Sequence, residues 1–345
     1  MRVGITGATG LLGWHLRCRL LAQDAIQPVV IDRRTWADVA GLAEALAQCD
    51  AVVHFAGVSR GPDDELERGN TRLAELLVAA LQESGATPHV MFSSSIHAAQ
   101  DSPYGRGKRA AEQVLEKWSS DVGAPCTIIR LPHVYGECGR PYHNSVVATF
   151  CHQLATREAP RVDRDGTVEL LHAQDVAAII LGSLSAPSCD GLRPEGAELR
   201  VTQLLQRLVS LNEQYLAGGI PALDDRLELN LFNTLRSYMF PERYPIRADL
   251  HADERGCLFE VVKAPYGGQA FVSTTHPGAT RGGHYHFHKF ERFAVLQGQA
   301  RIRVRRLLDQ SIRSFEVDGT APGFVDMPTL HTHAVSYTHL RAHET

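Results

Sequence analysis

The 345-residue chain has no apolar run approaching the roughly 20 residues that a membrane-spanning helix needs. Its formal net charge of −4 gives no excess of positive charge for nucleic acid or an anionic membrane. The seven cysteines are scattered and contain no Cys-x-x-Cys pair, which is typical of reduced thiols in a cytosolic protein. Residues Arg2 to Thr6 already have the pattern of a strand, so we expect no signal peptide. These absences predict a soluble, cytoplasmic protein whose partner is neither nucleic acid nor membrane.

The chain is long and apolar enough for two domains. Its 44% hydrophobic and 21% charged residues are typical of a globular protein, and its length suits two cores rather than one. Short β-branched runs alternate with helical patterns through the first half, which predicts an α/β domain with a Rossmann-type doubly wound parallel sheet. The expected strands are Val3–Thr6, Val29–Asp32, Ala51–Ala56, Val90–Ser93 and Thr127–Arg130.

From Gly256 onward the pattern changes. Short strand-like runs are separated by glycine-rich turns, which predicts a small all-β barrel. We therefore place a domain boundary near residue 245, with domains at residues 1–245 and 246–334. The expected barrel strands are Leu258–Val262, Ala270–Thr274, Phe293–Leu296, Ala300–Val304 and Phe315–Val317.

Three glycines follow the first expected strand and open the first expected helix. Gly7, Gly10 and Gly13 have the spacing Gly-x-x-Gly-x-x-Gly in this strand–turn–helix context. Glycine lets the backbone turn tightly and approach a pyrophosphate, which the free N–H groups of the helix N-terminus stabilise. The pattern predicts a dinucleotide site, with Thr9 and Leu12 of the same turn beside the cofactor.

The end of the second expected strand bears on the choice of dinucleotide. Asp32 can accept hydrogen bonds from a ribose hydroxyl, which favours NAD, whereas Arg33 and Arg34 can pair with a 2′-phosphate, which favours NADP. At least one arginine can equally well just begin a surface loop. The sequence therefore favours NADP(H) without excluding NAD(H).

A serine cluster and a Tyr-x-x-x-Lys motif indicate carbonyl reduction. Ser93 to Ser95 end a strand, and Tyr104 and Lys108 are four residues apart, so they share one face of a helix. The Lys108 ammonium is expected to lower the pKa of Tyr104 from roughly 10 and to hold the nicotinamide ribose. Such a tyrosine can protonate a carbonyl oxygen while a serine hydroxyl orients that carbonyl.

Together these motifs resemble the extended short-chain dehydrogenases/reductases (SDR) that act on nucleotide sugars, the NAD-dependent epimerase/dehydratase family. The resemblance also implies that Ala56, Gly57, Lys108 and Pro132 contact the cofactor and that the catalytic serine is Ser94 or Ser95. Two stretches, residues 93–108 and 144–151, are similar to the CapF-type bifunctional capsular-polysaccharide biosynthesis enzymes, in which such a reductase is fused to a C-terminal cupin.

The C-terminal region contains a candidate metal site. His284, His286 and Glu291 lie between Gly278 and Gly298, and two histidines with spacing two are expected on one face of a strand. Two imidazoles and a carboxylate suit zinc or a similar divalent ion. By resemblance to the second cupin motif, His333 completes the set. His331 competes with His333, His288 is a further candidate, and a solvated histidine-rich strand face is the simplest alternative.

The resemblance implies two reactions and a homodimer. The cupin would epimerise C3 of a UDP-4-keto-6-deoxy-HexNAc, and the reductase would then reduce the C4 ketone with NADPH. The product would be UDP-2-acetamido-2,6-dideoxy-L-talose, on the route to N-acetyl-L-fucosamine for capsule or O-antigen. Two alternatives stay open: a single-activity nucleotide-sugar epimerase or dehydratase whose cupin only dimerises the protein, and a non-enzymatic dinucleotide sensor.

The last residues do not resemble the rest of the chain. Residues 335–345 are similar to the translation of a sequencing adapter, so we expect them to be non-native and not to continue a strand. The cupin would then lack its closing strands, and His339 and His343 would not be metal ligands.

Overall fold

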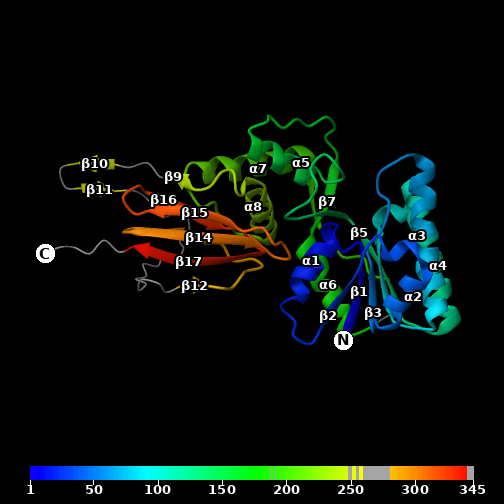
Figure 1. Ribbon diagram of the computed structural model, residues 1–345. Coiled ribbons are helices and arrows are strands. Elements are labelled where there is room, and N and C mark those ends of the chain that lie inside the picture. Colours follow the sequence, from blue (N-terminus) through cyan, green and yellow to red (C-terminus); the bar gives the residue numbers. More distant parts are fainter. Residues whose placement is uncertain (188, 190, 248–250, 254–255, 259–279, 340–345) are drawn as a thin grey trace. The chain divides into compact units, whose positions relative to one another are not determined.

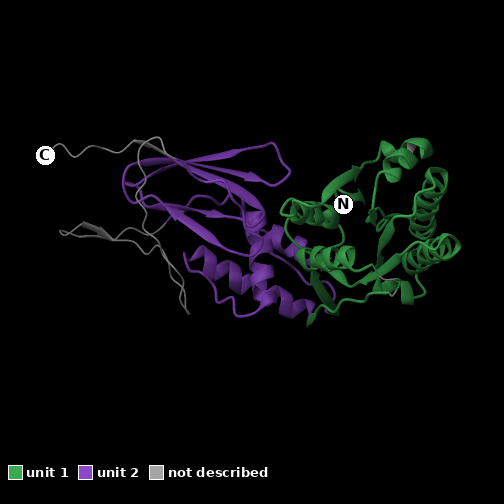
Figure 2. Ribbon diagram, turned by 90° about the horizontal axis from the view of Figure 1, so that it is seen from below, with its two compact units in different colours: residues 1–145, 167–199 green, residues 146–166, 200–345 purple. Residues whose placement is uncertain are grey.

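The computed structural model describes residues 1–187, 189, 191–247, 251–253, 256–258 and 280–339. The chain forms two compact units, shown in Figure 2: unit 1 contains residues 1–145 and 167–199, and unit 2 contains residues 146–166 and 200–345. Among the helices in these described ranges, none is long and apolar enough to cross a membrane.

The core of unit 1 is a five-stranded parallel sheet with strand order β2-β1-β3-β4-β5. All five strands predicted from the first half of the sequence are present. Because β1 is flanked by β2 on one side and β3 on the other, the strand order reverses at the β1–β3 pair. Ligands of such sheets bind outside the carboxyl ends of the strands at this point. The strands are β1 (Arg2–Thr6), β2 (Gln27–Ile31), β3 (Ala51–His54), β4 (His89–Ser95) and β5 (Cys126–Leu131).

Helices cover both faces of this sheet (Figure 1). Helices α2 (Val39–Ala47), α3 (Asp63–Ser84) and α4 (Pro103–Val122) bury one apolar cluster, whereas α1 (Leu11–Leu20) and α6 (Ala173–Ser185) bury another on the opposite face. The buried leucines of α2 and of α3 are four residues apart, which is the repeat of one helix face. Each such side chain contributes about 1.5–3 kcal/mol when it leaves water.

Two short helices and a second sheet complete unit 1. The 3-10 helix η1 (Thr35–Ala37) is separated from β2 by residues 32–34, and the 3-10 helix η2 (Ile96–Ala99) follows β4 directly. A second sheet has the order β6-β7-β8 and is formed by β6 (His133–Tyr135), β7 (Thr167–His172) and β8 (Ala197–Arg200).

Unit 2 combines helices with antiparallel sheets, so the predicted fold class, a parallel Rossmann-type sheet followed by C-terminal β structure, is confirmed. One sheet has the order β12-β17-β14-β15 and another the order β13-β16-β9, and β10 pairs with β11. Gly278 and most of the strands expected at residues 258–262 and 270–274 lie outside the described residues. The strands are β9 (Ile246–Arg247), β10 (His251–Asp253), β11 (Gly256–Leu258), β12 (Thr280–Gly282), β13 (Glu291–Ala294), β14 (Gln299–Arg306), β15 (Arg313–Asp318), β16 (Gly323–Met327) and β17 (His331–His339).

The expectation that residues 335–345 do not continue a strand is wrong for residues 335–339. β17 runs through to His339, and Val335 pairs with Ile302 of β14 while Ser336 pairs with Arg301. Val335 is buried in the apolar cluster of these sheets. The alternation of one inward and one outward side chain therefore continues past Ala334, which allows the ladder to continue as well. Residues 340–345 are outside the described part.

A buried polar cluster connects the helices of unit 2 to its sheets. Arg292 of β13 donates two hydrogen bonds to Asp326, directly opposite on β16, at 2.8 and 3.0 Å. Tyr215 of α7 (Val201–Leu216) donates to the same carboxylate, and Arg236 of α8 (Arg226–Met239) donates to the carbonyl of Met327 at 2.9 Å. These contacts explain why α7 and α8 group with the C-terminal strands although they precede residue 245. Helix α5 (Val146–Thr156) also belongs to unit 2.

Candidate active site and metal centre

In the turn after β1, the backbone at Gly7 packs against the backbone that follows β3, and the start of α1 packs against the turn itself. Gly7 has φ +63°, and a Cβ added there would lie 2.8 Å from the Ala56 nitrogen, while one added at Gly13 would lie 2.4 Å from the Gly7 oxygen. Gly10 is the N-cap of α1 and supplies no side-chain cap, so the first N–H groups of the helix remain available to an anion. Thr9 is exposed and Leu12 is half-buried at the same turn. This cradle fits the pyrophosphate of a dinucleotide.

Asp32 is held by its own loop. Its Oδ1 accepts hydrogen bonds from the backbone nitrogens of Thr35 and Arg34, at 3.0 and 2.9 Å, and from the Thr35 hydroxyl at 3.1 Å. The bonds from Thr35 and then Arg34 lower the pKa of this carboxyl. Arg33 and Arg34 are exposed beside it. The carboxylate therefore fixes the start of η1, while the two guanidinium groups are accessible to a ligand.

The three serines at the end of β4 face different partners. Ser93 donates to the His54 carbonyl at 3.1 Å, and Ser94 donates to the carboxylate of Glu112. Ser95 accepts from the His97 nitrogen at 3.2 Å and shares a hydrogen bond with Tyr104. Since side chains of a strand alternate between its faces, the structure brings Ser95 to Tyr104 and turns Ser94 toward Glu112.

Tyr104 and Lys108 lie on the first turns of α4, whose N-cap Ser102 accepts a hydrogen bond from Gly105 at 3.1 Å. The Lys108 ammonium is buried, donates to the Ser93 carbonyl at 3.0 Å and lies 6.0 Å from the centre of the Tyr104 ring. Burial lowers the pKa of Lys108 to about 8, against the opposing charge of Glu112.

The expectation that Lys108 lowers the pKa of Tyr104 is wrong for this structure. Burial raises the pKa of Tyr104, and the hydrogen bond with Ser95 only partly opposes that rise. Burial strips water from the phenolate and so destabilises it. The Lys108 ammonium, 6.0 Å from the centre of the ring, does not stabilise the phenolate enough to reverse that effect. Tyr104 is thus held as a neutral phenol, which is the form that can donate a proton.

Two side chains that the sequence did not single out shape this site. Asn70 of α3 accepts from the Val58 nitrogen at 3.1 Å and donates to its carbonyl at 2.7 Å, so it fixes the loop that carries Ala56 and Gly57. Glu112 accepts from Arg130 at 2.7 and 3.0 Å as well as from Ser94. The only sequence signal for either was a polar residue at a buried helix position. Pro132 is buried between β5 and β6.

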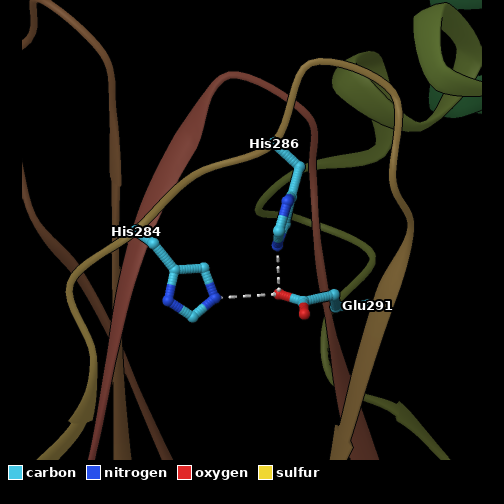
Figure 3. A group of neighbouring side chains, drawn as sticks. All are labelled: His284, His286 and Glu291. Carbon is cyan, nitrogen blue, oxygen red and sulfur yellow. Dashed lines mark ion pairs between the residues drawn. The ribbon is translucent and has the colours of Figure 1, made fainter. Parts of the chain in front are cut away.

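In unit 2, two histidines point at one carboxylate oxygen of Glu291 (Figure 3). The distances to Glu291 Oε2 are 3.2 Å from His286 Nε2, 3.7 Å from His284 Nε2 and 3.7 Å from His333 Nε2. Lys289 pairs with the other oxygen at 2.8 Å. Candidate ligand atoms of His284, His286 and Glu291 all lie within 4.8 Å of one another.

The donor set fits a divalent cation. His286 Nε2, His333 Nε2 and Glu291 Oε2 are buried and make no hydrogen bond within the part of the chain that the structure describes. Buried polar atoms without hydrogen bonds are rare in folded proteins unless they serve a ligand or ion. Imidazole nitrogens with one carboxylate oxygen are the ligands that zinc and similar ions take.

The histidines at 284 and 286 do not lie on a strand, contrary to the prediction. β12 ends at Gly282, and Gly282 and Gly283 have φ +112° and +83°, which directs the chain out of the sheet before His284. Glu291 is the first residue of β13 and His333 lies in β17. His331 instead bonds the Thr329 carbonyl at 2.9 Å and packs on Phe240.

The groups around the cluster shift the pKa values of Glu291 and His333. Burial raises the pKa of Glu291, but the hydrogen bond from Lys289 and the nearby charges of His286 and His333 outweigh it, so the pKa lies below its usual range. Burial lowers the pKa of His333, with Glu291 opposing. Metal binding requires an ionised carboxylate and neutral imidazoles, and the shifts of Glu291 and His333 are both in that direction.

Two family models match the chain. Residues 3–191 match the NAD dependent epimerase/dehydratase family, and residues 251–341 match the polysaccharide biosynthesis C-terminal domain. A UDP-2-acetamido-2,6-beta-L-arabino-hexul-4-ose reductase of Pseudomonas aeruginosa is 32% identical over 97% of this chain and 91% of its own length. A ceramide reductase of Caulobacter vibrioides is 30% identical over 54% of this chain.

Among solved structures, the chain is similar to the capsular polysaccharide assembling protein CapF from Staphylococcus aureus. The two share 31% identity with a TM-score of 0.68, over 98% of this chain and 93% of that one. A UDP-N-acetylglucosamine 4-epimerase from Bacillus cereus matches 62% of the chain with a TM-score of 0.53 and 21% identity, which shows a shared fold.

Proposed function

Since the chain belongs to the NAD dependent epimerase/dehydratase family, we propose that it is a nucleotide-sugar 4-ketoreductase with a second, metal-dependent epimerase site. As an NAD(P)-dependent enzyme of nucleotide-sugar metabolism for polysaccharide biosynthesis, it would act first at C3 of a UDP-4-keto-6-deoxy-HexNAc in unit 2. It would then reduce the C4 ketone in unit 1. The product is then a UDP-2-acetamido-2,6-dideoxy-L-talose.

The observation that carries the reductase is the arrangement of Ser95, Tyr104 and Lys108. When bound, the nicotinamide supplies the hydride. Ser95 accepts from a backbone nitrogen and shares a hydrogen bond with Tyr104, so its hydroxyl lies beside the phenol, where it can turn to orient a carbonyl oxygen. Tyr104 is a neutral phenol and gives that oxygen its proton. Lys108 supplies positive charge below pH about 8.

For the cofactor we propose NADP(H) over NAD(H), held by Gly7, Gly10, Gly13, Ala56 and Gly57. The Asp32 Oδ1 is already bonded three times within its loop, which leaves Oδ2 as the oxygen that could accept from a ribose hydroxyl. The exposed guanidinium groups of Arg33 and Arg34 beside it match a 2′-phosphate.

For the second site we propose that His284, His286, Glu291 and His333 hold one divalent ion, with zinc as the best fit. Such an ion acidifies the C–H next to a ketone by stabilising negative charge on the carbonyl oxygen. The antiparallel sheets around these residues suit a cupin barrel, and by family resemblance the protein would be a homodimer.

The test is purified protein with UDP-4-keto-6-deoxy-HexNAc and NADPH, or NADH. We expect NADPH oxidation with formation of a 4-hydroxy sugar, and a loss of about 100-fold or more in kcat for Tyr104→Phe. Absence of reduction by the wild type with either nucleotide would overturn the proposal. Full activity of Tyr104→Phe would overturn the role of the phenol.

A further inference from the structure

His97 stands at the reductase site but has no role in the reduction described above. It lies in η2, two residues after Ser95, and its backbone nitrogen donates to the Ser95 hydroxyl at 3.2 Å. Its half-buried ring approaches the Tyr104 ring edge-on, with centroids 6.2 Å apart. His97 therefore contacts both groups that would hold the reacting carbonyl, Ser95 through its backbone and Tyr104 through its ring.

The tautomer of His97 follows from its hydrogen bond with Gln100. The distance from His97 Nδ1 to Gln100 Oε1 is 2.9 Å, and the Gln100 nitrogen donates back to the His97 carbonyl at 2.8 Å. A carbonyl oxygen can only accept, so Nδ1 carries the hydrogen. In neutral imidazole the other nitrogen, Nε2, is then an acceptor.

Two further side chains, those of His133 and Arg109, lie near His97 or bind the backbone next to it. The His133 ring lies edge-on at 6.0 Å, and burial, followed by the effect of His97, lowers the pKa of His133. The guanidinium of Arg109 donates to the Ala98 carbonyl at 2.9 Å. His97 is thus flanked by the rings of Tyr104 and His133.

We propose that His97 is a specificity-determining residue whose Nε2 accepts a hydrogen bond from a hydroxyl or amide N–H on the sugar ring, next to the carbonyl that Ser95 and Tyr104 hold. The inference rests on the proposed carbonyl reduction. In a 4-keto-6-deoxy-HexNAc the C3 hydroxyl lies beside the ketone, and the acetamido N–H on C2 lies one carbon further away. A site that pairs an acceptor with a substrate donor discriminates against analogues that lack the donor, because the acceptor then loses its partner.

Two replacements separate the nitrogens of His97. The amide of glutamine reaches the position of Nε2, whereas the amide of asparagine reaches only that of Nδ1. With the UDP-4-keto sugar and NADPH, we expect His97→Gln to keep kcat/KM within about threefold of wild type. We expect His97→Asn to lose about 10- to 100-fold, mostly through KM. The dissociation constant for NADPH should stay unchanged in both, because the cofactor needs no contact with Nε2.

The matched control is His152 of α5, also half-buried and edge-on to a tyrosine, Tyr238, at 6.4 Å. His152→Asn and His152→Gln should have equal kcat/KM. Equal losses in His97→Asn and His97→Gln, or no loss in either, would overturn the inference, as would a parallel loss of NADPH binding. A wild type that binds NADPH but reduces no ketone would instead overturn the proposed function.

Discussion

At the scale of single residues, one strand position separates a serine that can assist catalysis from a serine that supports the structure. Ser94 donates to the buried carboxylate of Glu112, which also pairs with Arg130, whereas Ser95 meets Tyr104. The two hydroxyls have the same chemistry, so their function is set by the face of β4 on which each lies.

We predict different consequences for the two alanine variants. Ser95→Ala should lower kcat about 100-fold, because it removes the hydroxyl proposed to orient the reacting oxygen, and should cost about 0.5–2 kcal/mol of unfolding free energy, because that hydroxyl also accepts from the His97 nitrogen. Ser94→Ala should cost about 1–3 kcal/mol of unfolding free energy and leave kcat within a few-fold, because it leaves Glu112 short of one donor. Steady-state kinetics and urea unfolding measure both, and a larger kcat loss in Ser94→Ala would reverse the assignment.

The pKa of Lys108 predicts that the activity of the reductase falls on the alkaline side of its pH profile, called the basic limb below. Burial holds its pKa at about 8, below the ordinary 10.5, so the ammonium is present below that pH and is lost as pH rises through it. We expect kcat/KM to fall above pH 8 by about tenfold per unit. Because the Glu112 charge raises the pKa of Lys108, Glu112→Gln should move this limb to lower pH.

The control for that profile is Lys117, an exposed lysine of the same helix paired with Asp121 at 2.7 Å. Lys117→Gln should leave the limb in place. An unchanged limb in Glu112→Gln, or a shifted one in Lys117→Gln, would show that another group titrates.

At the scale of elements, the Arg292–Asp326 pair joins β13 to β16, and Tyr215 joins both to α7. The pair is directly opposite in the strand register, and its two side chains are at most 3% exposed. A slip of one residue would turn every side chain of β13 to the other face, including Glu291. The buried pair thus favours the single register that presents Glu291 to the histidines.

We predict that Asp326→Asn lowers the unfolding free energy of unit 2 by about 3–5 kcal/mol, because it leaves the buried Arg292 guanidinium without its counter-charge. The exposed pair of Arg301 and Glu316, also across two strands, is the control. Arg301→Gln should cost less than about 1 kcal/mol. Urea unfolding followed by fluorescence gives both values, and equal losses would contradict a special role for the buried pair.

At the scale of the whole molecule, the two candidate sites belong to different compact units. The side chains of each site therefore come from one unit. A change that disables one site should leave the activity of the other site intact. The two proposed reactions can also be measured separately. Epimerisation is followed by the entry of solvent deuterium at C3, and reduction is followed by oxidation of the nicotinamide.

We predict that chelation removes the metal and abolishes deuterium exchange at C3 while leaving the dissociation constant for NADPH unchanged. Glu291→Gln should reproduce the loss of bound metal, because it removes the anionic ligand. Elemental analysis, NMR of the sugar and fluorescence titration of NADPH measure the three quantities. Deuterium exchange that persists in metal-free protein would refute a metal-assisted proton transfer.

Much of this organisation could be predicted from local sequence. The five parallel strands and the Gly7–Gly13 turn follow from patterns a few residues long, whose physical basis is strand and helix periodicity. The grouping of His284, His286 and Glu291 was also predictable from their spacing, and that of His333 from the resemblance, although the strand expected at His284 was wrong because two glycines end β12 first. The expected end of the last strand at residue 334 was wrong because cross-strand pairing with β14 carries it to His339.

The sequence by itself determined which chemical groups the protein has and the class of fold that carries them, because glycine turns, strand alternation and helix spacing act over short stretches of chain. Only the tertiary structure decided which of these groups act together. It placed Ser95 rather than Ser94 at Tyr104, raised the pKa of that phenol by burial, and set the tautomer of His97 through Gln100. These outcomes depend on which face of an element is covered and on how much water is excluded, and both are properties of the assembled fold.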